Sequence, residues 1–167
     1  YGVGLNVGYA SGDDDPEDKT FKTFTFDSNY DISLMLFDQV LPTLQPTVNN
    51  STNNGLETGA AQTGNYIGNA IYVQPRFSYA VSETFTPAVS VLLARTARLP
   101  EEEDGNENYG AEINLDVQYE PVNHFQLLGK LGVLFPGTHF ANYTDPDFGG
   151  GFNQTAYGAE VNVVVQF

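Results

Sequence analysis

The sequence contains no cysteine and no tryptophan, and only six of its 167 residues are lysine or arginine. The lack of cysteine excludes disulfide bridges and cysteine-based zinc sites. Against 21 acidic residues and a net charge of -15, so few basic residues exclude a nucleic-acid partner, because phosphate contacts need clustered Lys and Arg side chains. The chain also lacks any run of about eighteen apolar residues, which a transmembrane helix would require.

The acidic residues are concentrated in three stretches that are rich in Gly and Asn. Sixteen of the 21 Asp and Glu residues fall within 12–68, 97–108 and 136–155. An evenly solvated surface would spread its charge along the chain, so this distribution predicts three polar loops that separate more regular segments.

Six segments between these stretches alternate apolar and polar residues, which is the pattern of a strand with two unlike faces. The clearest is 109–120, where Tyr109, Ile113 and Tyr119 belong to the apolar row and Glu112 belongs to the polar row. In this segment an aromatic residue stands at each end of the apolar row. The six predicted strands are 1–10, 70–79, 85–94, 109–120, 125–135 and 157–167.

The connections between the predicted strands alternate between long and short. Residues 11–69, 97–108 and 136–155 form the long ones, and 81–84 and 121–124 form the short ones. A soluble β-sandwich also alternates, but its loops are of similar length at both ends. Strands of about ten residues or more, aromatic ends and this asymmetry favour an antiparallel transmembrane β-barrel of the bacterial outer membrane.

In that interpretation 1–167 is a single β-barrel segment whose short turns are periplasmic. The stretch 12–68 is then a long extracellular or inward-folded loop, and 97–108 and 136–155 are extracellular loops. Six strands cannot close a membrane barrel, for which about eight is the working minimum. The remaining strands are therefore expected from a missing N-terminal part, from other protomers, or from a further hairpin of 21–27 and 30–38. The first is favoured because 30–38 alternates poorly, and 21–46 is then an inward-folded or surface-packed loop.

Two stretches resemble known outer-membrane proteins. The end of the chain is similar to the C-terminal signal that the barrel assembly machinery reads, with alternating apolar residues before a final Phe: Tyr157, Val161, Val163, Val165 and Phe167. The run Ala10-Ser11-Gly12-Asp13-Asp14-Asp15-Pro16-Glu17-Asp18 resembles a loop of the alginate-export-like outer-membrane barrels. This resemblance implies a pore in a barrel of many more than six strands, of which this chain is the C-terminal part.

The polar row of such a barrel faces its lumen. Lys130 is expected to lie near Glu112 or Asp116 as a structural ion pair. A net acidic lumen predicts a preference for cations, and it differs from the Arg-lined pore expected of an exporter of anionic polysaccharide. The predicted lumen-lining residues are Arg76, Glu112, Asn114, Asp116, Glu120, Lys130 and Glu160.

Two further groups have a site interpretation and a plainer one. The cluster Asp13, Asp14, Asp15, Glu17 and Asp18 offers the hard oxygen ligands that Ca²⁺ prefers, but it lacks the EF-hand spacing and is more typical of a solvated acidic loop. Arg95 and Arg98 are expected at the outer rim, where lipopolysaccharide phosphates would sit, and snorkelling to the interface accounts for them as well.

The sequence carries no recognisable catalytic motif, so we do not expect an enzyme. Apart from the candidate Ca²⁺, no cofactor is expected. The predicted function is an outer-membrane channel or porin for small or polymeric solutes, with outer-membrane lipid, lipopolysaccharide and the assembly machinery as partners. The alternative is a structural barrel, a sleeve that holds a partner such as an electron-transfer protein across the membrane. An adhesin or receptor that acts through the acidic loops is a third option.

Overall fold

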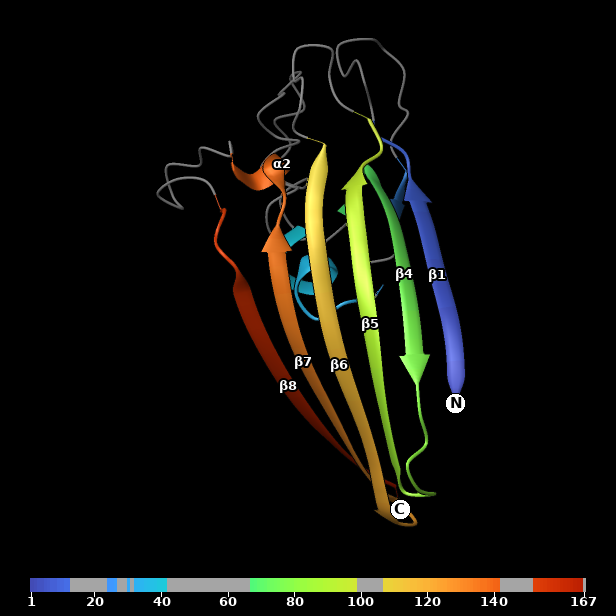
Figure 1. Ribbon diagram of the computed structural model, residues 1–167. Coiled ribbons are helices and arrows are strands. Elements are labelled where there is room, and N and C mark those ends of the chain that lie inside the picture. Colours follow the sequence, from blue (N-terminus) through green and yellow to red (C-terminus); the bar gives the residue numbers. More distant parts are fainter. Residues whose placement is uncertain are drawn as a thin grey trace.

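The computed structural model describes residues 1–12, 24–26, 30, 32–41, 67–98, 107–141 and 152–166. Six strands form one antiparallel sheet in the order β1, β4, β5, β6, β7, β8 (Figure 1). This sheet confirms the expected all-β class and the position of each predicted strand to within about two residues. The strands are β1 (Gly2–Ala10), β4 (Ala70–Ser78), β5 (Phe85–Thr96), β6 (Asn108–Val122), β7 (Phe125–Pro136) and β8 (Ala156–Val165).

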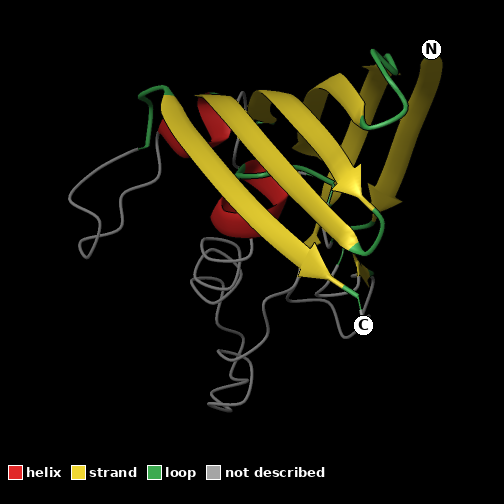
Figure 2. Ribbon diagram, turned by 90° about the horizontal axis from the view of Figure 1, so that it is seen from below, coloured by secondary structure: helices red, strands yellow, loops and turns green. Residues whose placement is uncertain are grey.

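The smaller elements lie on one side of this sheet. They are the short strand pair β2 (Thr25–Phe26) and β3 (Ile67–Gly68), the π-helix η1 (Leu36–Val40) and the helix α2 (Thr138–Ala141). Seen along the strands, the sheet is curved and the helices lie on its concave side (Figure 2). None of the helices in the described residues is long and apolar enough to cross a membrane.

The outer, convex face of the sheet carries the apolar row and has no protein layer against it among the described residues. Thirteen of its apolar side chains are between 36 and 77 % exposed, more than is usual for the side chains of a packed core. They are Val3, Leu5, Val7, Val73, Phe77, Val89, Leu93, Ile113, Leu115, Leu131, Val161, Val163 and Val165.

The inner, concave face carries the polar row, and residues 32–41, here named the inner segment, pack against it. Most of the core lies between this segment and the sheet, and it includes Leu36 and Leu41 from the segment and Leu92 and Leu134 from the sheet. The polarity of the sheet is therefore the reverse of that of a β-sandwich, in which the apolar row would be buried.

One part of the predicted apolar row is wrong. Tyr109 does not continue the outer row of β6, because it is the extra residue of a β-bulge: Ala94 pairs with Gly110, and Arg95 pairs with Asn108. Gly110 has a φ of 121°, which a side chain would strain. The ring of Tyr109 turns inward, where it is 1 % exposed and packs on Phe140, and its hydroxyl donates to the Asn69 carbonyl oxygen at 3.0 Å.

The sheet is open within the part of the chain that the structure describes, with β1 and β8 as its two edges. The hairpin turns lie at the opposite end of the strands from the inner segment (Figure 1). The β6–β7 turn is tight, because Val122 pairs with Phe125 and His124 adopts a φ of 71°.

Candidate functional site

The inner segment begins with a short apolar run in an otherwise polar connection. Ser33 accepts a hydrogen bond from the Phe37 backbone N–H at 3.0 Å through its hydroxyl, and this contact closes the first turn. The Val40 N–H donates to the Met35 carbonyl oxygen at 2.8 Å, which gives the wider π-helical turn. Leu34 to Phe37 are buried on the sheet, whereas Asp38 and Gln39 are exposed and point away from the core.

Glu112 of β6 holds this segment by its backbone. Its Oε1 accepts a hydrogen bond from the Met35 N–H at 2.9 Å, and its Oε2 accepts one from the Leu36 N–H at 2.6 Å. The side chain is 0 % exposed. A buried carboxylate needs such donors, and hydrogen bonds to a charged acceptor are about twice as strong as neutral ones. Glu112 is therefore the main polar anchor of the inner segment.

Two amides of the same face extend the anchor along the segment. The Asn114 Oδ1 accepts from the Leu34 N–H at 3.4 Å, and the Gln74 side-chain amide of β4 donates to the Ile32 carbonyl oxygen. Gln74 in turn accepts a hydrogen bond from Asn6 of β1 at 2.9 Å. The segment is thus tied to β4 and β6 directly, and to β1 through Gln74.

A slot between two glycines receives the apolar side chains of the segment. Gly132 of β7 and Gly158 of β8 are register partners on the inner face. A Cβ atom at either position would lie 3.1–3.2 Å from side-chain atoms of Leu34 and Met35, closer than ordinary contacts. Because neither glycine has a side chain, Leu34 and Met35 pack directly on the backbone of the sheet.

Aromatic rings close the β1–β4 side of the segment. Phe37 packs edge-on against Tyr72 with ring centroids 5.2 Å apart, and Phe26 stacks on Tyr30 at 4.8 Å. The hydroxyls of Tyr30 and Tyr72 are hydrogen-bonded to each other. The Tyr72 ring lies directly over Gly8 of β1, so a side chain at Gly8 would collide with it.

Below the inner segment, toward the hairpin turns, the inner wall carries paired charges. The Arg76 guanidinium lies 3.3 Å from the Asp116 carboxylate. Asp116 is also the register partner of Lys130, which is the partner of Glu160 on the next strand. Charge therefore alternates across the inner face of the sheet, and Arg76, Asp116 and Lys130 border a hollow of about 320 Å³. The sequence predicted that Lys130 lies near Glu112 or Asp116, and in the structure it lies opposite Asp116.

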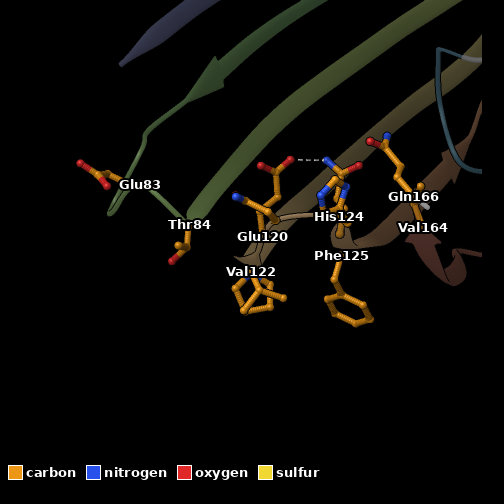
Figure 3. Close-up of a pocket in the computed structure, with 11 residues that line it drawn as sticks. Glu83, Thr84, Glu120, Val122, His124, Phe125, Val164 and Gln166 are labelled. Carbon is orange, nitrogen blue, oxygen red and sulfur yellow. Dashed lines mark hydrogen bonds between the residues drawn. The ribbon is translucent and has the colours of Figure 1, made fainter.

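A second hollow, of about 490 Å³, lies at the end of the sheet where the hairpin turns are. Glu120 accepts hydrogen bonds there from the side-chain amides of Gln118 at 2.8 Å and Gln126 at 2.7 Å. Figure 3 shows Glu120 and His124 on one side of the turn and Phe125 pointing to the other. The polar side chains that line this hollow can form hydrogen bonds with water and solutes. Their arrangement does not match that of a nucleophile with its base.

The predicted lumen-lining residues all lie on strands of the sheet, and they divide into two groups. Glu112 and Asn114 are covered by the inner segment, whereas Arg76, Asp116, Glu120, Lys130 and Glu160 lie below it. Sequence reasoning missed the role of Leu34 to Phe37 and of the two slot glycines. Two signals in the sequence could have indicated it. One is the apolar run Leu34 to Phe37 within an acidic connection, and the other is the presence of glycines in two polar rows.

The candidate Ca²⁺ ligands Asp13, Asp14, Asp15, Glu17 and Asp18 lie outside the described residues, and so does Phe167 of the expected assembly signal. Tyr157, Val161, Val163 and Val165 lie on β8 and are exposed. Among the residues that the structure does describe, no three acidic, His or Cys side chains are grouped in a way that could hold a metal ion.

Comparisons of the chain with models of protein families, with curated proteins and with solved structures gave no match.

Proposed function

We propose that this chain forms part of the wall of a β-barrel channel in a bacterial outer membrane, and that the inner segment narrows its lumen. The observation that carries the proposal is the reversed polarity of the sheet. Its apolar face is exposed, and its polar face is covered in part by the inner segment. Water disfavours an apolar face of this extent, whereas the hydrocarbon core of a bilayer accepts it.

The dimensions of the strands support the same proposal. The six strands have 9 to 15 residues, and a tilted bilayer crossing needs about 9–11. The free edges of β1 and β8 would leave backbone groups unpaired in lipid, at a cost of several kcal/mol each. Barrel closure therefore needs further strands, supplied by the rest of a longer chain or by other protomers.

A channel agrees better with the inner face than a sleeve does. A sleeve requires a smooth wall that is free to hold another chain. Here the inner wall between β4 and β8 is already occupied by Leu34 to Phe37, which are anchored by Glu112. The charges of Arg76, Asp116 and Lys130 remain accessible below the segment, where they would face a water-filled path.

A pair of arginine substitutions on β6, made in the complete barrel with its further strands, tests which face meets lipid. Leu115→Arg places a charge on the outer face and should cost about 2–4 kcal/mol near the middle of a bilayer, which is enough to abolish folding into lipid vesicles. Gln118→Arg is the matched control on the inner face, where its side chain is exposed, and it should fold normally. Folding is followed by heat-dependent gel mobility, and the folded protein is then tested for conductance in planar bilayers.

Two results would contradict the proposal. If both variants fold equally well in buffer without lipid, the outer face does not require a membrane. If protein that is correctly folded in lipid conducts no ions, the barrel is closed or filled, and the sleeve becomes the better interpretation.

A further inference from the structure

The outer face has a hollow at the end of the strands nearest the inner segment. It has a volume of about 770 Å³, and its floor is apolar, formed by Val73, Leu93, Ala111 and Phe135. Those four residues are in register across β4, β5, β6 and β7, so they form one row of the outer face.

Two features create the hollow in this row: a small residue within the row and the β-bulge beside it. Ala111 is a small residue between the large side chains of Leu93 and Phe135. On the side toward the long connections, the bulge has turned the ring of Tyr109 to the inner face. The space in which the regular pattern would place an aromatic ring on the outer face therefore stays open.

A cation stands at the rim of the hollow. Arg95 borders it, and its guanidinium lies 3.5 Å from the Glu107 carboxylate, with both side chains about 60 % exposed. Exposed pairs of this kind contribute little and are screened by salt. A phosphate group accepts two parallel hydrogen bonds from a guanidinium and carries more charge than a carboxylate, so it can displace Glu107.

We infer that this hollow binds an acyl chain of the phosphorylated glycolipid of the external leaflet, with Arg95 on the lipid phosphate. The inference rests on the proposed function, which turns the outer face to lipid and the long connections to the outside. The apolar floor of the hollow matches the acyl chain of such a lipid, and Arg95 at its rim matches the phosphate. Its position near the long-connection end favours the glycolipid over the phospholipid of the opposite leaflet.

Native mass spectrometry tests the site on the folded protein in detergent micelles titrated with bisphosphorylated lipid A. Arg95→Gln should lower the retention of lipid A about tenfold, the effect of losing a hydrogen bond between charged groups. Glu107→Gln should raise retention, because it removes the competing carboxylate. Ala111→Phe should lower it by filling the hollow. Ala159→Phe, the same change on the outer face of β8, is the matched control and should leave retention unchanged.

Equal retention by the wild type, Arg95→Gln and Ala111→Phe would overturn the site. Retention of phosphatidylglycerol as strong as that of lipid A would overturn the assignment to the glycolipid. Protein that conducts in planar bilayers but binds lipid A equally in every variant refutes this site and leaves the channel standing. A complete barrel, with its further strands, that does not enter lipid at all refutes both.

Discussion

Replacing Glu112 by glutamine removes one of the two acceptors that hold the inner segment to the wall. One oxygen remains for either the Met35 or the Leu36 N–H, and the new amide group presents a donor to the other. The loss of a hydrogen bond to a charged acceptor costs about 1.5–3 kcal/mol, and a buried N–H left without a partner costs about 1–3 kcal/mol. We take about 3 kcal/mol as the expected loss, which corresponds to about a hundredfold rise in the population of the detached segment.

The absence of cysteine from the chain makes this loss measurable. Met35→Cys places a single thiol in the glycine slot, where Met35 is 7 % exposed, so a maleimide reaches it only when the segment detaches. The labelling rate of Met35→Cys should rise about a hundredfold when Glu112→Gln is added. Glu120→Gln lies on the inner face of the same strand, is exposed, and should leave the rate unchanged. A rise of less than about threefold with Glu112→Gln would show that the carboxylate is not the anchor.

Two further predictions concern the slot and the paired charges of the inner wall. Gly158→Leu fills the slot that receives Leu34 and Met35, and it should destabilise the docked segment by about 1–3 kcal/mol, measured as faster labelling of the same Met35→Cys thiol. Lys130→Gln leaves Asp116 and Glu160 opposed by Arg76 alone, so reversal potentials at low salt should shift toward cations, and the shift should shrink as salt rises. An unchanged reversal potential would show that these charges do not set the ion selectivity of the proposed channel.

Much of the sheet could be predicted from the sequence because side-chain alternation is a local property. The alternation of β6 alone assigns Ile113 and Leu115 to one face and Glu112 and Asn114 to the other. The structure confirms both assignments. Tyr109 broke the pattern because a bulge shifts the alternation by one residue. Gly110 permits that bulge, yet a glycine within a strand is equally typical of a tight bend or of a close approach by another backbone.

The role of Glu112 could not be predicted in the same way. The pattern placed it on the inner face among lumen-lining residues, but its partners are backbone groups 76 and 77 residues away in the sequence. Almost every residue type has a backbone N–H group, so the identity of Leu36 does not indicate that this group binds a carboxylate. For the same reason the pattern could not show that Glu112 is covered, although one of its two pairings for Lys130, the one with Asp116, is the register that the structure has.

The residues of the inner segment that anchor it differ from those that it exposes. Glu112 binds the backbone of Met35 and Leu36, and the slot receives two side chains that face the wall. Asp38 and Gln39 face away from it and are exposed. Because the anchor recognises peptide groups, the residues at positions 38 and 39 can change without loosening it. In the proposed channel, substitutions at these two positions would change the surface that faces the lumen while the sheet and its anchor stay the same.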